Sequence, residues 1–152
     1  MTAREREWAA ERIKTQALAW GVGFASSEEI DSDGIVNAGR LAGLRALARL
    51  GVIPQALLTD FRLELPELDL PQVALVRGDV CCMSIAAASV LAKTARDLVM
   101  REIDLQLPGY GLAQHKGYGT RLHCMAIRQM GRSPIHRRTF SMGSWAMSAP
   151  DD

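Results

Sequence analysis

The spacing of apolar and polar positions along the chain predicts helices first. Thr2 and Glu5 form a capping box, and the segment from Ala3 to Ala19 follows with residues that favour helix. Ser26 and Glu29 repeat the capping-box pattern and are expected to open a short helical turn. Two helical segments are therefore expected in the N-terminal part of the chain, separated by residues without a helical pattern.

The helical pattern returns three times further along the chain. After Asp33-Gly34, which interrupts the short turn, a helix is expected from about Val36 to Leu50. A long helix is expected from Ser84 to Leu107, and the small residues in its first turns indicate that another segment approaches it closely. Thr120 caps a further helix that ends at Met130.

Short apolar runs predict three strands. The first covers Trp20 to Ala25, where large and small residues alternate, and the second covers Gln55 to Phe61. The third covers Val73 to Val76 and is followed by Arg77-Gly78-Asp79. Residues 62–72 hold prolines and alternate leucines with acids, which predicts a loop along the surface.

Helices alternate with strands, which predicts an α/β fold. The chain has no internal repeat and no linker, so residues 1–140 are expected to form one domain. Residues 141–152 have no periodicity and are expected to form a flexible C-terminal tail. A hydrophobic content of 48% with 23% charged residues is ordinary for a soluble globular protein.

The sequence offers no signal for a membrane or for export. No apolar run reaches the roughly 18 residues that a membrane-spanning helix needs. The first residues include acids and no apolar stretch, unlike a signal peptide. We therefore expect a cytoplasmic protein with no membrane partner.

Charge is distributed unevenly, although the net charge is only +1. Acids outnumber bases before Arg77, bases outnumber acids from there to Phe140, and no acid falls between Leu105 and Pro150. A basic face of this kind attracts polyanions, above all nucleic acid. A solvated surface whose balancing acids come from elsewhere in the fold explains the charge equally well.

The three cysteines are too few and too uneven in spacing for a secreted disulfide scaffold. A zinc site would have to combine Cys81, Cys82, His123 and Cys124. Neither adjacent pair has the two-to-four-residue gap that lets neighbouring ligands converge on one ion. Buried or unreactive thiols are therefore the favoured interpretation.

Two aspartates stand out as candidate metal ligands. Asp60 and Asp79 each follow a short apolar strand, and one loop joins the two strands. Adjacent strands lie about 4.8 Å apart, so carboxylates at their ends can share one or two hard cations. Aspartate also caps or turns the chain after many strands, and spacing alone favours that simpler interpretation.

Several motifs, taken in order, change this weighting. They are Val76-Arg77-Gly78-Asp79, the segment from Ser84 to Asp97 (SIAAASVLAKTARD), Pro108-Gly109-Tyr110-Gly111, His115-Lys116-Gly117-Tyr118-Gly119-Thr120, and Pro134-Ile135-His136-Arg137-Arg138-Thr139-Phe140. Their order and spacing closely resemble those of bacterial ribonuclease HII, from about residue 2 to residue 140.

The resemblance implies a ribonuclease H-like fold, in which helices flank a mixed sheet. It implies an endonuclease that hydrolyses the RNA strand of RNA–DNA hybrids and cuts 5′ to ribonucleotides embedded in duplex DNA. Two Mn²⁺ or Mg²⁺ ions held by four carboxylates carry out this chemistry, and the third and fourth carboxylates fall on Asp60 and Asp79. Asp97 is the alternative fourth ligand, but an ion pair on the helix face with Lys93 or Arg101 explains it more simply.

The resemblance also implies how the substrate is bound. Tyr118 falls on the family tyrosine that stacks on the sugar beside the ribonucleotide, whereas Tyr110 is expected to pack in the core. The candidate phosphate contacts are Arg77, Lys93, Lys116, His136 and Arg137, with capping of a helix end as the alternative for the last two. The partner is an RNA–DNA hybrid or DNA with embedded ribonucleotides, and the complete family protein is expected to be a monomer.

One family motif has no counterpart in these 152 residues. The first two carboxylates belong to an Asp-Glu-x-Gly-Arg-Gly motif, and Asp-Glu occurs nowhere in the sequence. We expect an N-terminally shortened chain that lacks the first two strands of the family sheet, with a misplaced start codon as one explanation. Those strands would lie between residues 20–25 and 55–61, which leaves the latter as an unpaired edge.

This departure sets the expected activity. Two carboxylates provide too few ligands and too little charge for two divalent ions, so we expect weak metal binding and little or no nuclease activity from this chain alone. Two alternatives remain open, a non-catalytic module that binds hybrids and an inert fragment without a stable fold.

Overall fold

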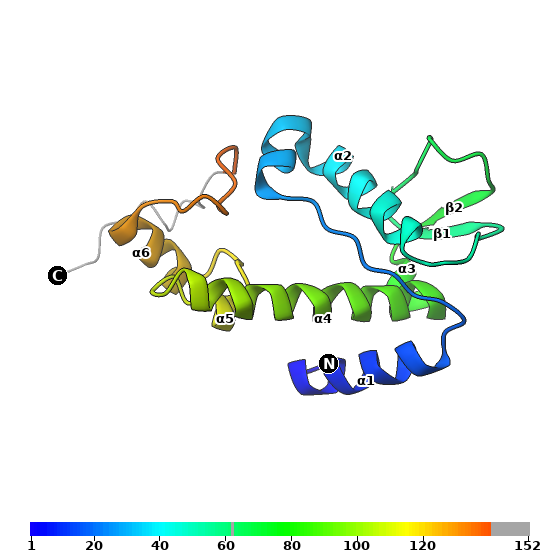
Figure 1. Cartoon of the computed structure of the whole chain (residues 1–152), viewed down its shortest axis with the longest axis horizontal. Helices are drawn as coiled ribbons and strands as arrows, with labels where there is room; N and C mark the ends of the chain where they lie inside the picture. The colour runs from blue at the N-terminus through cyan, green and yellow to red at the C-terminus, as the bar shows by residue number, and fades with distance from the viewer. Residues whose placement is uncertain (62, 141–152) are drawn as a thin grey trace. The chain divides into compact units, whose positions relative to one another are not determined.

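The structure is a computed structural model that describes residues 1–61 and 63–140. It contains helices and a two-stranded parallel sheet, as expected for an α/β fold (Figure 1). The chain divides into two compact units, Met1–Ala95 and a second unit that begins at Arg96, and each is described by itself. The expected flexible tail, residues 141–152, lies outside the described residues.

The predicted capping boxes begin the first two helices. Helix α1 spans Ala3–Gln16, and Thr2 Oγ1 accepts a hydrogen bond from the Glu5 N–H at 3.2 Å while the Glu5 carboxylate accepts from the Thr2 N–H. Helix α2 spans Ser27–Ala48 and begins with the same reciprocal pair at Ser26. Gly34, with φ 80° and ψ 161°, interrupts α2 where the sequence predicts a break.

The predicted strand at residues 20–25 is not formed, and this expectation was wrong. The segment is extended but pairs with no strand of the described chain. Side chains from α2 satisfy its backbone instead, because Arg45 Nη1 donates to the Phe24 carbonyl at 2.8 Å and Arg49 Nη1 donates to the Val22 carbonyl. Arginine guanidinium groups thus take the place of a neighbouring strand.

Two glycines let this extended segment lie directly on α2. A Cβ atom at Gly21 would lie 2.3 Å from the Ala46 carbonyl oxygen, and one at Gly23 would lie 2.0 Å from that of Ala42. No side chain larger than hydrogen fits at such distances, since the opposing atoms are helix backbone. The alternation of large and small residues that predicts a strand here therefore has a different cause, close packing on a helix.

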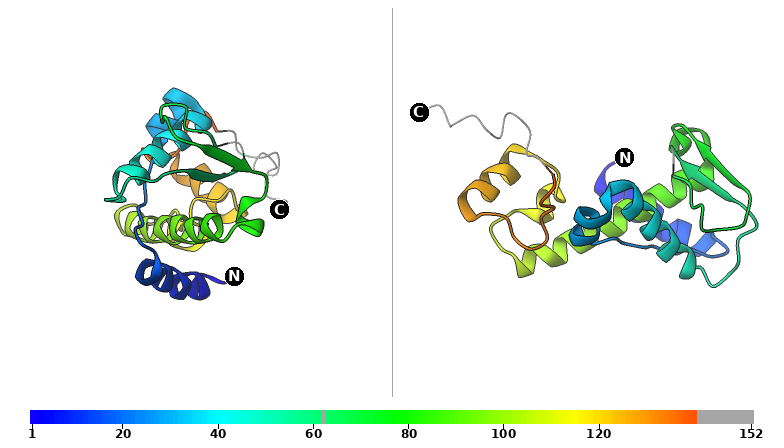
Figure 2. Two further views of the ribbon diagram at one scale, coloured as in Figure 1. Left: turned by 90° about the vertical axis from the view of Figure 1, so that its right-hand side faces the viewer. Right: turned by 90° about the horizontal axis from the view of Figure 1, so that it is seen from above.

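The two other predicted strands form, the first shorter than expected and the second shifted by one residue. Strand β1 spans Leu57–Asp60 and strand β2 spans Gln72–Leu75, and they run parallel and side by side (Figure 2). Asp60 is in register with Leu75, so the carboxyl ends of both strands lie at the same edge of the sheet.

The loop between the strands is more deeply packed than the sequence suggests. Residues 63–71 form the predicted surface loop, but Leu65 is only 3% exposed and packs against Gly43 of α2. The Gln72 side-chain amide closes this loop, because it accepts from the Leu65 N–H at 2.9 Å and donates to the Leu65 carbonyl at 2.8 Å.

Two helices follow β2. The short helix α3 spans Gly78–Cys81, and helix α4 spans Met83–Gln106. Gly78 is buried where Ile85 of α4 lies against it, and a Cβ atom on Gly78 would come within 2.6 Å of Ile85 Cδ1. This contact fixes the turn after β2 on the first turn of α4.

The second unit contains the C-terminal part of α4, the short helix α5 (Leu112–His115) and helix α6 (Arg121–Met130). The sequence predicts α6 and its Thr120 cap but not α5, which forms within residues 109–119, where glycines are frequent. Tyr110, Leu112 and Ala126 form a buried cluster. The packing role expected for Tyr110 is confirmed, and its hydroxyl donates to the Gly131 carbonyl at 3.0 Å.

None of the helices in the described ranges combines the length and the apolar character that crossing a lipid bilayer requires.

Candidate functional site

Asp60 and the turn that leads to Asp79 lie at one edge of the small sheet. Asp60 is the last residue of β1, and its Oδ1 accepts a hydrogen bond from the Gly78 N–H at 2.8 Å. Asp79 directly follows Gly78 and belongs to the first turn of α3. Both side chains are exposed, so their remaining oxygens are accessible from solvent.

The placement of Asp79 corrects one detail of the sequence prediction. Asp79 does not end a strand, because β2 stops at Leu75 and a turn intervenes. Arg77 adopts a left-handed conformation (φ 57°, ψ 41°) and redirects the chain into α3. This turn brings the Gly78 N–H to the Asp60 carboxylate. If β2 continued straight, the Gly78 N–H would lie further along the strand axis.

The backbone is strained at the candidate residues. Within the described ranges, the non-glycine residues with positive φ are Phe61, Arg77 and Lys116. Phe61 directly follows Asp60, and a bulky residue rarely adopts this conformation. Such strain costs about 1–3 kcal/mol per residue and tends to be kept where a site requires it. The strained positions thus support function both at the sheet edge and near Tyr118.

The cysteines do not join this sheet edge into a larger metal site. Within the described ranges, no three or more His, Cys, Asp or Glu side chains are grouped so that they could hold a metal ion. Cys124 is buried, and Cys82 Sγ lies 3.2 Å from Ser84 Oγ, whose hydrogen bond lowers the pKa of the Cys82 thiol. The two aspartates are therefore the carboxylates to consider at the sheet edge.

Arg96 organises the loop that carries Tyr118. The Tyr118 ring is 57% exposed, and the Arg96 guanidinium carbon lies 4.4 Å from the centre of that ring. Arg96 Nη2 also donates to the Lys116 carbonyl at 2.8 Å, while the Lys116 amine donates to the Ala113 carbonyl. Arg96 thus fixes both the ring and the backbone of this loop, a role that the sequence prediction missed.

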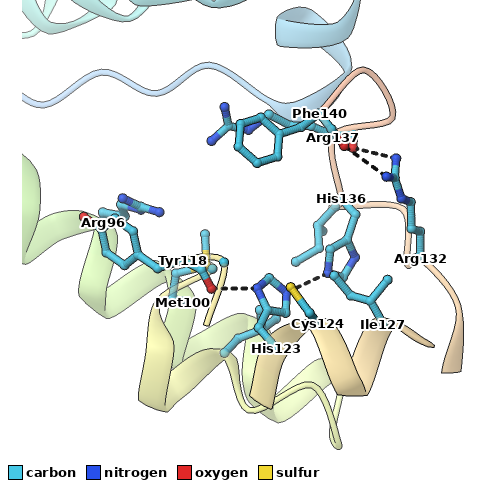
Figure 3. Close-up of a pocket in the computed structure, with 14 residues that line it drawn as sticks. Arg96, Met100, Tyr118, His123, Cys124, Ile127, Arg132, His136, Arg137 and Phe140 are labelled. Atoms are coloured by element: carbon cyan, nitrogen blue, oxygen red, sulfur yellow. Dashed lines mark hydrogen bonds between the residues drawn. The ribbon is translucent and has the colours of Figure 1, made fainter. Parts of the chain in front are cut away.

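The three histidines lie together beneath the same loop. The rings of His115 and His123 stack with centroids 4.2 Å apart. His123 Nε2 lies 3.0 Å from His136 Nε2 (Figure 3). His123 Nδ1 lies 2.9 Å from the Tyr118 carbonyl oxygen. On the other side, His136 Nδ1 accepts from the Ser133 N–H at 3.0 Å.

Burial lowers the pKa of both His123 and His136. Electrostatic interaction with neighbouring groups acts in the same direction, from His115 on His123 and from Arg132 on His136. Both shifts favour the neutral imidazoles, whose hydrogen bonds stay within the protein.

A pocket of about 290 Å³ opens beside this cluster. Its lining includes Tyr118, His123, His136, Arg137 and Phe140. The Arg137 guanidinium lies 5.4 Å from the centre of the Phe140 ring. Polar, cationic and aromatic groups therefore share one concave surface, which suits a phosphate-bearing or aromatic ligand.

Arg132 holds together the segment that forms one wall of this pocket. Its guanidinium donates to the carbonyls of Arg137, Arg138 and Phe140 at 2.8–3.1 Å, as Figure 3 shows in part. The side chain is thus used to fold the 132–140 segment, on which Arg137 is half-buried and Arg138 is exposed.

The other predicted residues are placed as follows. Arg77 and Lys93 are exposed in the first unit. Asp97 is only 8% exposed on α4 and takes part in local interactions, so the ion-pair interpretation stays a prediction. His136 is half-buried with both ring nitrogens engaged, and contact with a phosphate is not its evident role.

Known proteins show similarity along almost the whole chain. The sequence model described as Ribonuclease HII matches residues 1–146. A protein of Myxococcus xanthus named Ribonuclease HII is 50% identical over 150 residues, which cover 99% of this chain and 51% of that protein. Similar proteins of the same name occur in Dehalococcoides mccartyi, with 48% identity over 141 residues (93% of this chain, 66% of that protein), and in Moorella thermoacetica, with 51% over 138 residues (91% and 66%). The chain spans between about half and two thirds of the length of these relatives.

Proposed function

Because this chain belongs to the ribonuclease HII family, we propose that it provides part of the site of an endoribonuclease. The substrate is an RNA–DNA hybrid or duplex DNA with an embedded ribonucleotide, cut on the 5′ side of the ribonucleotide. The observation that carries this proposal is the hydrogen bond from the Gly78 N–H to the Asp60 carboxylate, which brings the residue before Asp79 to the carboxyl end of β1.

The donor groups at this edge fit Mg²⁺ or Mn²⁺. Both ions prefer oxygen ligands, and Asp60 and Asp79 present exposed carboxylates. When bound, such ions neutralise phosphate charge and activate a water molecule for attack. The contribution of this chain is to orient the two carboxylates, through the hydrogen bond to Gly78 and the turn at Arg77.

Two carboxylates do not suffice for a pair of divalent ions. They supply about two negative charges against roughly four positive charges, and most of the coordination positions would stay with water. We therefore propose that these 152 residues alone bind metal weakly and cleave slowly, and that the complete site takes further carboxylates from a segment with the family's Asp-Glu-x-Gly-Arg-Gly motif.

The exposed faces of the sheet support the same proposal. Parallel strands are normally covered on both faces, yet Leu58 of β1 is 48% exposed and Val73 of β2 is 50% exposed. We propose that further strands of a ribonuclease H-like sheet pair with β1 and that additional elements cover these apolar side chains.

The second unit supports a role in substrate binding. Tyr118 presents an exposed ring, and a stacking contact of this kind is worth about 1–3 kcal/mol. Lys116 and Arg137 of this unit supply positive charge for phosphates, and Arg77 and Lys93 supply it in the first unit. Since Tyr118 and its supports all lie within this chain, a non-catalytic hybrid-binding module is the second candidate function.

A segment exchange tests the proposal. The part of the Myxococcus xanthus relative that matches this chain is replaced by the 152 residues, and cleavage of duplex DNA with one ribonucleotide is measured with Mn²⁺ or Mg²⁺. We expect cutting 5′ to the ribonucleotide by the exchanged protein and far slower cutting by the chain alone.

The possible results separate the candidates. A folded exchanged protein that binds the duplex without cutting it favours the binding module. One that neither binds nor cuts contradicts both functions. Rapid cutting by the chain alone keeps the family activity but contradicts the proposal that two carboxylates are too few.

A further inference from the structure

The backbone groups that contact His123 and His136 select one arrangement of protons. A carbonyl oxygen only accepts, so the contact with the Tyr118 carbonyl requires a proton on His123 Nδ1. A backbone N–H only donates, so the contact with Ser133 requires that His136 Nδ1 carry none. In their neutral forms, His136 Nε2–H therefore donates to His123 Nε2, at the observed 3.0 Å.

This arrangement forms a continuous chain of hydrogen bonds. It runs from the Ser133 N–H through His136 and His123 to the Tyr118 carbonyl, and we call these four residues the histidine relay. His136 Nδ1 faces both the Ser133 N–H and, at 2.7 Å, the Ser133 hydroxyl, whereas each other ring nitrogen of the relay has one partner. An added proton on either ring would leave two N–H groups facing each other, so it would break one of these contacts.

The relay ends at the residue proposed to contact the substrate. The Tyr118 carbonyl accepts both from His123 Nδ1 and from the Thr120 N–H at 2.7 Å, while the Tyr118 N–H donates to the His115 carbonyl at 2.9 Å. The backbone of Tyr118 is thus held from within the protein. Its ring, by contrast, is exposed under the Arg96 guanidinium.

We propose that His123 and His136 are positioning residues that fix the backbone of Tyr118, and that they couple its orientation to the 133–136 segment. The proposal rests on the proposed function only where it concerns binding of hybrid duplexes, since the relay itself is a property of the folded chain. His136 acts here through His123 and Tyr118 and makes no contact with the substrate.

The proton arrangement gives a test that needs no nucleic acid. Long-range ¹H–¹⁵N spectra of the 152-residue chain at pH 7.5 distinguish the two neutral tautomers of each imidazole. We expect a proton on Nδ1 in His123 and on Nε2 in His136. The Nε2-protonated form of His123, which predominates in free histidine, would overturn the relay.

Two substitutions at His123 separate positioning from mere packing. The Asn amide reaches about as far as Nδ1, so His123→Asn keeps a donor for the Tyr118 carbonyl. The Gln amide reaches about as far as Nε2, so His123→Gln loses that donor but keeps contact with His136. We expect the ¹³C shift of the Tyr118 carbonyl to move in His123→Gln and to stay near the wild-type value in His123→Asn.

Binding to a fluorescent RNA–DNA hybrid then tests the consequence for function. The wild-type chain and His123→Asn are expected to bind alike, and His123→Gln about 3- to 10-fold more weakly, the effect of one hydrogen bond. Equal carbonyl shifts or equal affinities for the Asn and Gln variants would overturn positioning by His123.

Folding and function are controlled separately. Should His123→Gln fail to melt cooperatively, His136→Leu opens the relay from its other end and is expected to let the His123 tautomers interconvert; an unchanged His123 tautomer would overturn the coupling. If the wild-type chain binds no hybrid, the proposed function fails, and the spectra alone decide on the relay.

Discussion

The carboxylates of Asp60 and Asp79 and the imidazoles of His123 and His136 are presented in opposite ways. At the sheet edge, the carboxylates are exposed, and one backbone N–H orients Asp60. In the histidine relay, each ring nitrogen has a partner inside the protein. A metal ligand needs an oxygen lone pair that no hydrogen bond occupies. A residue that must be held rigidly needs its polar atoms hydrogen-bonded within the protein.

The comparison also explains why the two regions differ in completeness. The sheet edge is two strands wide, with apolar side chains exposed on β1 and β2. The histidine relay connects α6 to the segments on both sides of it, and its hydrogen bonds lie within this chain. The first region is suited to combine with a further segment, and the second acts without one.

The largest expected effect concerns the carboxylates. In the exchanged protein, Asp60→Asn or Asp79→Asn is expected to lower the rate of ribonucleotide-directed cleavage by at least about 10³-fold, because each removes charge that stabilises the transition state by several kcal/mol. Asp69→Asn, at an exposed loop position, is the matched control and should cut at the unsubstituted rate. Cleavage that survives at Asp60 or Asp79 would remove that residue from the site.

A pair of glycine substitutions compares the packing of the two regions. Gly78→Ala is expected to lower the free energy of unfolding by about 1–3 kcal/mol, because its Cβ would lie 2.6 Å from Ile85 Cδ1 and 3.3 Å from Leu75 Cβ. Gly119→Ala meets no atom within 4 Å and should be neutral or stabilising by up to about 1 kcal/mol. Urea denaturation measures the free energy of unfolding of both variants. Equal changes in the two would show that the side chain of Ile85 can move to admit a Cβ atom at Gly78.

The smallest expected effect is on pH dependence. Burial lowers the pKa of His123 and His136 below the ordinary 6.5 of the unfolded chain, so the unfolded state binds more protons as the pH falls. The relay's stabilisation should be fully present above pH 6.5 and lost progressively below it. Electrostatic interaction with His115 and Arg132 lowers the pKa of these rings further and adds to the effect. Thermal unfolding between pH 5 and 7.5 measures it, and an equally steep dependence in His123→Asn would contradict the assignment.

Much of the fold is predictable from local signals. The capping boxes at Thr2 and Ser26, the break at Gly34 and the Thr120 cap each depend on a few adjacent residues, and each forms as predicted. The strand prediction at residues 20–25 failed because a strand needs a partner. Its alternating pattern instead reflects Gly21 and Gly23 packing on α2, which depends on residues far along the chain.

The candidate site divides in the same manner. Asp60, Asp79 and Tyr118 were found because motif order and spacing resemble those of a known family. Arg96 and the relay were missed because they act through contacts between separate segments, α4 with the Tyr118 loop and α6 with residue 136. One signal was available for His123, which is the third residue after the Thr120 cap and whose N–H that cap holds close to the loop.

Binding of Mn²⁺ to the 152-residue chain tests the central claim most directly, since it requires neither substrate nor a further segment. Titration monitored by electron paramagnetic resonance should detect weak binding to the wild-type chain that disappears in Asp60→Asn/Asp79→Asn and persists in Asp69→Asn. Binding that the double substitution leaves unchanged would contradict the account, because the cation would then be held elsewhere than at the edge formed by β1 and the turn after β2.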